Sequence, residues 1–98
     1  STWTQSIEHP EFRRQVEWEL DGLEQANVIL LYLDPNTKAP ISLLELGLFA
    51  RSGKLLVGCP DGYWRKGNVE VVCATYDIPL YPTLDALISG VRQRLEAL

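Results

Sequence analysis

Apolar residues recur along this chain with two alternating periods, which predict helices separated by short strands. Between Pro10 and Ala26 they are spaced by three or four positions, as on one face of a helix: Phe12, Val16, Leu20 and Leu23. Pro10 suits the first turn of that helix, because its missing amide hydrogen would be unpaired there anyway. The polar residues 1–9 before it predict no regular element. Residues 28–33 (VILLYL) are apolar on both faces and therefore predict an interior strand of a parallel sheet.

The next segments continue the alternation. After a turn that contains two prolines, the apolar residues from Ile41 to about Ser52 predict a short helix that stops at Gly53. Residues 54–59 (KLLVGC) predict the second strand. After the loop 60–67, Asn68 is a suitable N-cap for a helix over residues 69–76. The Val-Glu-Val-Val run of that segment leaves a strand as the alternative.

The C-terminal part predicts one more strand and one more helix. Residues 78–81 form a short third strand, and Thr83 is placed to cap the helix that follows. The apolar residues of that helix form a single stripe: Leu84, Leu87, Ile88, Val91, Leu95 and Leu98.

This order of elements predicts one α/β domain over residues 1–98. Helices that alternate with strands through short connections imply a parallel sheet with right-handed crossovers. We therefore expect a flavodoxin-like or Rossmann-like three-layer fold with three strands and four helices. A strand as apolar as residues 28–33 is unfavourable at an exposed edge, where it would pair with another chain. We therefore expect the N-terminal edge of the sheet to be incomplete in this chain. Either one or two strands are missing through truncation or cleavage, or a second molecule supplies the strand that covers this edge.

Composition and charge restrict the partners. Apolar residues make up 46% and charged residues 22% of the chain, which is a globular balance. The net charge of -4 argues against nucleic acids and anionic membranes, which require clustered basic residues. No apolar run approaches the roughly 20 residues that cross a bilayer, and no signal pattern opens the chain, so we expect a soluble, cytoplasmic protein. Cys59 and Cys73 form no CxxC motif, and we expect buried thiols and no metal or redox cofactor.

Glu45 departs from the apolar pattern of its helix. It is the only charged residue between Ala39 and Ala50, and on a helical wheel it falls beside Ile41 and Leu48. A carboxylate on the apolar side of a helix is expected to have a specific role. One structural role is available, because Ser42 and Glu45 match the spacing of a capping box.

Glu19 lies at the edge of the apolar stripe of the first predicted helix, whereas Glu17 and Glu24 point outward. The structural alternative is a glutamate that bends to solvent. Glu19 and Glu45 are on helices that flank the same strand, so we expect Glu19 to be buried near Glu45 at the carboxyl end of the sheet. Two acids in one apolar cleft are typical of sites that separate a nucleophile from a general acid.

Three segments together resemble the nucleoside 2-deoxyribosyltransferases, in particular their divergent relatives. They are residues 16–30 (VEWELDGLEQANVIL), residues 35–47 (PNTKAPISLLELG), and the Gly-Lys pair at 53–54 before an apolar strand. The resemblance implies that Glu45, in the Glu-Leu-Gly element, attacks the anomeric carbon of the sugar. It implies that Glu19 stands in place of the usual Asp that positions the substrate and handles protons. It also implies that Asn68 binds the sugar hydroxyls in the site of a neighbouring subunit.

The sequence also departs from the family pattern. The acid that typical members carry six positions before the nucleophile corresponds to Ala39, and the usual Ala-Asp before the strand is Ala26-Asn27. Typical members also begin with a strand and a Gly-containing loop that have no counterpart in this sequence. These departures leave the source of the proton for the leaving base open.

The function implied is N-glycosidic bond chemistry on a nucleoside or nucleotide, namely deoxyribosyl transfer between bases through a covalent glycosyl-Glu45 intermediate. The alternatives are hydrolysis on the same scaffold and a non-catalytic nucleotide-binding module. Tyr63 and Trp64 are expected to stack on the base, although Trp64 also fits a surface residue that covers the end of the sheet. We expect no cofactor, and either a homo-oligomer or association with a missing N-terminal segment. The Walker and GxGxxG motifs of NTPases and nicotinamide enzymes are absent.

Overall fold

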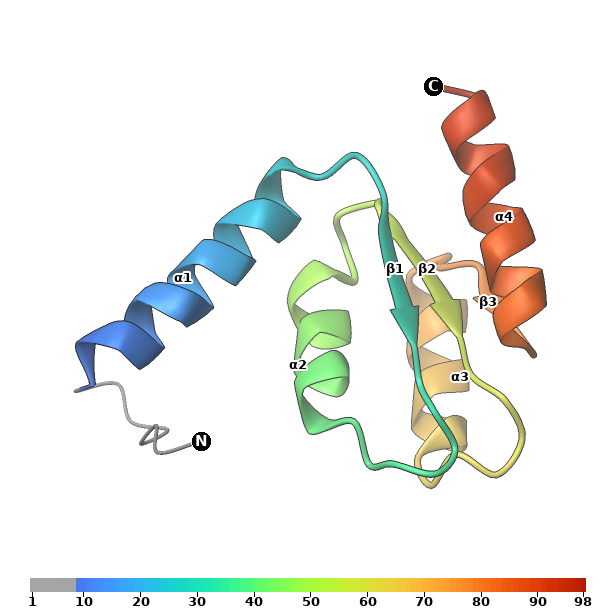
Figure 1. The fold of residues 1–98 in the computed structure, drawn as a ribbon. Helices are drawn as coiled ribbons and strands as arrows, with labels where there is room; N and C mark the ends of the chain where they lie inside the picture. Colours follow the sequence, from blue (N-terminus) through green and yellow to red (C-terminus); the bar gives the residue numbers. More distant parts are fainter. Residues whose placement is uncertain (1–8) are drawn as a thin grey trace.

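The computed structural model describes residues 9–98 and shows helices and strands in strict alternation (Figure 1). The elements are α1 (Pro10–Gln25), β1 (Ile29–Tyr32), α2 (Pro40–Phe49), β2 (Leu55–Gly58), α3 (Lys66–Thr75), β3 (Leu80–Tyr81) and α4 (Leu84–Glu96). The predicted α/β class is confirmed, and so is the predicted order of four helices and three strands. The prediction for residues 1–8 lies outside the described residues.

The three strands form one parallel sheet in the order β1-β2-β3. Leu31 is in register with Val57, and Val57 with Leu80. All four residues of β2 are buried, as expected for a central strand. β1, which the sequence predicts as an interior strand, lies at one edge of the described sheet and leaves Leu30 48% exposed.

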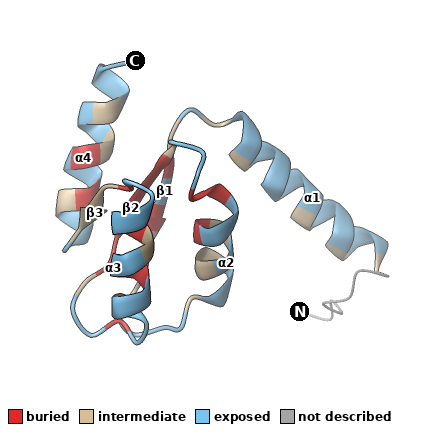
Figure 2. Ribbon diagram, turned by 180° about the vertical axis from the view of Figure 1, so that it is seen from behind, coloured by how far each residue is buried: buried red, intermediate tan, exposed pale blue. Residues whose placement is uncertain are grey.

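Helices cover both faces of the sheet and make three layers (Figures 1 and 2). On one face, the alternate strand residues 29, 31, 33, 55, 57 and 59 pack with Leu46 and Phe49 of α2 and with Val69 and Cys73 of α3. On the other face, Leu87 of α4 lies against β2 so closely that a Cβ added to Gly58 would meet it at 3.0 Å. The core is therefore built around β2, with α2 and α3 on one side and α4 on the other.

Most of α1 lies apart from this core, against which Leu23 near its C-terminal end packs. None of its residues is buried, and its N-terminal part points away from the sheet (Figure 2). Its C-terminal end is tied down, because the Nζ of Lys54 donates a 2.5 Å hydrogen bond to the carbonyl of Glu24. No helix within the described part of the chain combines the length and hydrophobicity needed to cross a membrane.

The predicted capping box of α2 and the predicted start of α3 are wrong. α2 begins at Pro40, so Ser42 lies inside the helix and the capping box is not formed; the N-cap is Ala39, in the left-handed region at φ 47°. α3 begins at Lys66 with Arg65 as N-cap, so Asn68 is also inside its helix. A turn that starts at Tyr63, whose carbonyl accepts from the amide of Lys66, moves this start forward. The predicted cap of α4 is confirmed, because the Thr83 hydroxyl accepts from the amide of Ala86 at 3.1 Å.

Candidate active site

A cleft of about 260 Å³ lies between α1 and α2 and contains both acids that the sequence singles out. Its walls are mostly apolar and come from both helices: Phe12, Gln15, Val16, Glu19, Leu20, Ile41, Leu44, Glu45 and Leu48. The α2 side of this wall is open, since Ile41, Leu44 and Leu48 are each more than half exposed. The cleft exists because the apolar stripe of α1 faces this open side of α2 while α1 itself stays off the sheet.

Glu45 is half-buried in the wall of this cleft. Burial raises the pKa of its carboxyl group above the ordinary value, and the nearby charge of Glu19 raises the pKa further. Because Ser42 is not an N-cap, the capping box gives no reason for an acid at this position. Glu45 is therefore a carboxylate held in apolar surroundings opposite a second acid, without a local structural role.

Glu19 lines the same cleft but is exposed, so the prediction that it is buried is wrong. Its proximity to Glu45 is confirmed, since the two acids border two adjoining hollows and interact electrostatically. One carboxylate oxygen of Glu19 accepts a 3.0 Å hydrogen bond from the side-chain amide of Gln15. The exposure follows from the position of α1, because the part of the helix that carries Glu19, unlike Leu23 at its end, does not pack against the core.

The cleft is not at the carboxyl end of the strands, where the sequence predicts it. Its lining residues all belong to α1 and α2, and no strand residue is among them. Glu45 lies five residues after Pro40, which places it more than one turn along the helix and away from the strand end.

Tyr63 and Trp64 lie outside the cleft lining and connect the loop after β2 to the loop after β1 by hydrogen bonds. The Tyr63 hydroxyl and the Trp64 indole N–H both donate to the carbonyl oxygen of Lys38, at 2.5 and 3.0 Å. Tyr63 is buried, which raises the pKa of its hydroxyl. Trp64 is half exposed, and the cations of Lys38 and Arg65 lie over its ring. The stacking of these aromatic residues on a base stays a prediction.

Asn68 lies on α3 and faces a different hollow, between α2 and α3, which Leu43 and Gly47 also line. Since Glu45 is on the α1 side of α2, Asn68 and Glu45 of one chain are not brought together. Its role in the site of a neighbouring subunit stays a prediction. Lys66, near Asn68, donates to the carbonyl of Cys59 at 2.7 Å and pairs with Asp61 at 3.5 Å.

Gln15 is the cleft residue that the sequence reasoning missed. Its signal is its position four residues before Glu19, which places the two side chains on one face of α1. The cysteines do not contribute to the cleft: both are buried, and burial raises the pKa of Cys73 to about 11, which keeps this thiol protonated. No cluster of His, Cys, Asp and Glu within residues 9–98 is arranged to hold a metal ion.

The fold and the cleft together indicate the class of protein. A parallel α/β sheet flanked by a helix that carries a partly buried glutamate, with a second acid facing it, is an arrangement suited to glycosyl chemistry. The family model described as "nucleoside 2-deoxyribosyltransferase like" matches residues 1–63, more than half of the sequence. The chain belongs to this family. The match contains Glu19, Glu45 and Tyr63, whereas Trp64 and Asn68 lie beyond it. The search of curated proteins found no match.

Proposed function

We propose that this protein transfers a deoxyribosyl group between nucleobases, with Glu45 as the nucleophile. The observation that carries the proposal is the half-buried carboxyl group of Glu45, which faces Glu19 in an apolar cleft and whose pKa is raised. Cleavage of an N-glycosidic bond develops positive charge at the anomeric carbon. A carboxylate at that point stabilises the charge and then captures the sugar.

Residues of the cleft can supply the nucleophile and the proton that the transfer reaction requires. A carboxylate oxygen of Glu45 forms a bond to the anomeric carbon while the bond to the base nitrogen breaks, and the electron pair of that bond leaves with the base. The leaving base takes a proton from Glu19 or from water. A second base then attacks the anomeric carbon, releases Glu45 and returns a proton, so that one nucleoside replaces another.

The charges of the cleft favour a nucleoside over a nucleotide. The lining includes two acids and no Lys or Arg, so a phosphate would be repelled. The neighbouring cations Arg65 and Lys66 lie outside this lining. Arg65 lies over the Trp64 ring, and Lys66 contacts Asp61 and the carbonyl of Cys59. The volume of about 260 Å³ lies just below the range of ligand pockets, roughly 300–1,000 Å³, so the cleft suits a small ligand.

Hydrolysis is the second candidate, and the exposure of Glu19 favours it. A carboxylate open to solvent can position a water molecule against the anomeric carbon of the glycosyl-Glu45 intermediate. The products separate the two reactions. Transfer consumes an added foreign base and yields a new nucleoside, whereas hydrolysis releases free deoxyribose and leaves the added base unchanged.

The test is Glu45→Gln, assayed with a deoxynucleoside and a foreign base. This substitution keeps the shape but removes the nucleophile, and the loss of one well-placed electrostatic group typically costs about 10²–10³ in rate. We expect activity to fall at least that far while circular dichroism and thermal unfolding stay near those of the parent.

Glu17→Gln is the matched control, because Glu17 is an exposed acid of α1 whose carboxylate pairs with Arg13 and does not line the cleft. It should keep the parent activity. If Glu45→Gln retains activity within tenfold of the parent, or if the parent binds nucleosides without turning them over, the nucleophile role is wrong and the binding-module alternative replaces it.

A further inference from the structure

Both acids of the cleft also border a second hollow, toward the C-terminal end of α1. Its volume is about 270 Å³, and its lining consists of Trp18, Glu19, Gly22, Leu23 and Glu45. The α1 residues of the cleft run from Phe12 to Leu20, whereas those of the second hollow run from Trp18 to Leu23. Glu19 and Glu45 therefore stand at the boundary between the two hollows, and a bond at this boundary joins one group in each of them.

Trp18 offers the second hollow an uncovered aromatic face. It is 74% exposed, and within residues 9–98 no cation lies over its ring and its indole N–H binds no acceptor. Trp64 differs in both respects, because Lys38 and Arg65 lie over its ring and its N–H donates to the carbonyl of Lys38. Of these two tryptophans, Trp18 is the one whose ring and N–H are both available to a ligand, and it borders the same hollow as Glu45.

Gly22 keeps this aromatic face open. Side chains of a helix lean toward its N-terminus, so a side chain at position 22 would lie over residue 18, one turn earlier. Glycine places no side chain there, and a Cβ added to Gly22 would meet nothing within 4 Å. Glycine inside a helix is less favourable than alanine, and no close packing within residues 9–98 requires it at this position. The space over Gly22 therefore belongs to the hollow and is not a requirement of the fold.

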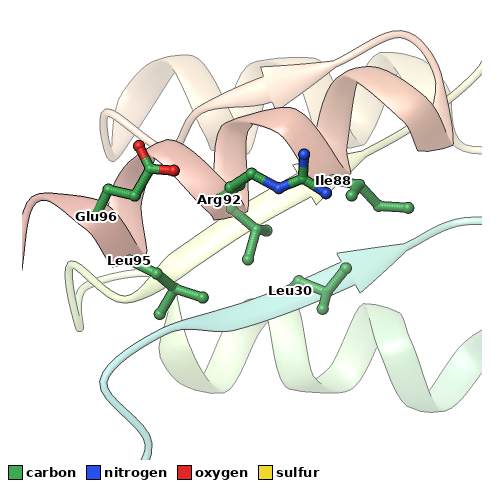
Figure 3. Close-up of a pocket in the computed structure, with 6 residues that line it drawn as sticks. Leu30, Ile88, Arg92, Leu95 and Glu96 are labelled. Atoms are coloured by element: carbon green, nitrogen blue, oxygen red, sulfur yellow. The ribbon is translucent and has the colours of Figure 1, made fainter.

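Other hollows of the surface do not adjoin the acids. The apolar groove of about 480 Å³ beside α4 is bordered by Leu30 and Leu95 (Figure 3), and neither Glu19 nor Glu45 lines it. The hollow that Asn68 faces, between α2 and α3, contains neither acid. A group that leaves from a carbon at Glu45 has to lie next to that carboxylate, so these two hollows are unsuited to hold it.

We propose that the hollow beside Trp18 is the nucleobase subsite, in which the base stacks on the indole ring while the cleft between α1 and α2 holds the sugar. This assignment rests on the proposed function of Glu45. Every base is planar and has a π-face, so stacking on an exposed indole ring accepts any of them. That tolerance suits a site that takes a donor base and an acceptor base in turn.

The position of Glu19 and the size of the two hollows fit the same assignment. Glu19 borders both hollows, so the nitrogen of the glycosidic bond lies beside an acid that can supply the proton for the leaving base. Each hollow alone is slightly smaller than most ligand pockets, which measure roughly 300–1,000 Å³, and the two adjoining hollows together reach that range.

Binding of free bases to Glu45→Gln tests the subsite, because binding needs no turnover. Tryptophan emission is recorded while adenine, hypoxanthine, cytosine or thymine is added up to millimolar concentration, and equilibrium dialysis gives the dissociation constant. We expect at least one base to bind and to quench the emission. Trp18→Leu in the same background should remove this quenching and raise the dissociation constant by about tenfold, and Trp18→Phe, which keeps a smaller ring, should raise it less. Trp64→Leu should leave the quenching in place.

Gly22→Leu fills the hollow without removing the ring. It should raise the dissociation constant by about tenfold, while circular dichroism shows a folded chain. Gly67→Leu is the matched control, because Gly67 is a glycine of α3 whose added Cβ would also meet nothing within 4 Å and which lines neither hollow. It should bind bases as the parent does.

The role of Glu45 is decided separately, by whether the parent turns over deoxynucleosides and Glu45→Gln does not. The subsite at Trp18 would be overturned by a dissociation constant that Trp18→Leu changes by less than about twofold, by quenching that disappears in Trp64→Leu instead, or by the failure of all these bases to bind.

Discussion

At the scale of single residues, the apolar surroundings of Glu45 determine how its charge affects stability. Its pKa in the folded chain lies above that in the unfolded chain, because burial and then Glu19 disfavour the ionised form. The folded state therefore binds the proton more tightly. The stability that this difference supplies is present below the ordinary pKa of 4.5 and is lost as the pH rises through the folded-state pKa. At neutral pH the charge of Glu45 lowers stability, which is why Glu45→Gln is expected to fold.

The interaction between the two acids predicts a shift in the pH profile of activity. As a nucleophile Glu45 must be ionised, so the rate should rise with pH through its folded-state pKa. Glu19→Gln removes one of the two causes that raise this pKa, and the acidic limb of the profile should move to lower pH. The measurement is kcat/KM against pH for the parent and the variant.

Glu17→Gln again serves as the control for this profile. It removes a charge from the same helix, but its carboxylate lies 3.6 Å from Arg13 and outside the cleft. Its acidic limb should coincide with that of the parent. An equal shift in both variants would mean that the overall charge of α1, rather than the electrostatic interaction between Glu19 and Glu45, moves the pKa of Glu45.

At the scale of elements, two glycines in helices predict opposite effects of the same substitution. A Cβ on Gly90 of α4 would collide with the ring and hydroxyl of Tyr81, whereas a Cβ on Gly22 of α1 would meet nothing within 4 Å. Gly90→Ala should therefore lower the free energy of unfolding by about 1–3 kcal/mol. Gly22→Ala should stabilise α1 by about 0.5–1 kcal/mol, since alanine is the better helix former. Urea unfolding measures the first change, and amide exchange in α1 the second. Equal effects at the two sites would contradict the close packing of Tyr81.

The helices and strands themselves were largely predictable, because each has a clear apolar periodicity and is separated from the next by a short connection. The start of α2 was predicted to within one residue. The start of α3 was missed, because a turn that begins at Tyr63 leads into the helix before Asn68 is reached. The pairing of Glu19 with Glu45 followed from the helical wheels. The exposure of Glu19 did not, because a wheel shows which side of a helix is apolar but not whether anything packs against it.

At the scale of the whole molecule, stability should be distributed unevenly between α1 and the rest. α1 buries no residue and is tied down near its C-terminal end by Lys54, whereas β2 is fully buried. We predict that in native-state hydrogen exchange the amides of α1 open with a free energy far below that of global unfolding, and those of β2 close to it. Lys54→Met should accelerate exchange in α1 without changing β2. Protection in α1 equal to that in α4 would show that α1 is part of the cooperative core.

The bonds that Tyr63 and Trp64 make to Lys38 have a consequence for how this protein tolerates sequence drift. Their shared acceptor is a backbone carbonyl, which every amino acid supplies. Position 38 can therefore change its side chain during evolution without loss of the link, while positions 63 and 64 are restricted to side chains that can donate. The loops after β1 and after β2 therefore stay joined as long as those two donors persist, whichever side chain stands at position 38.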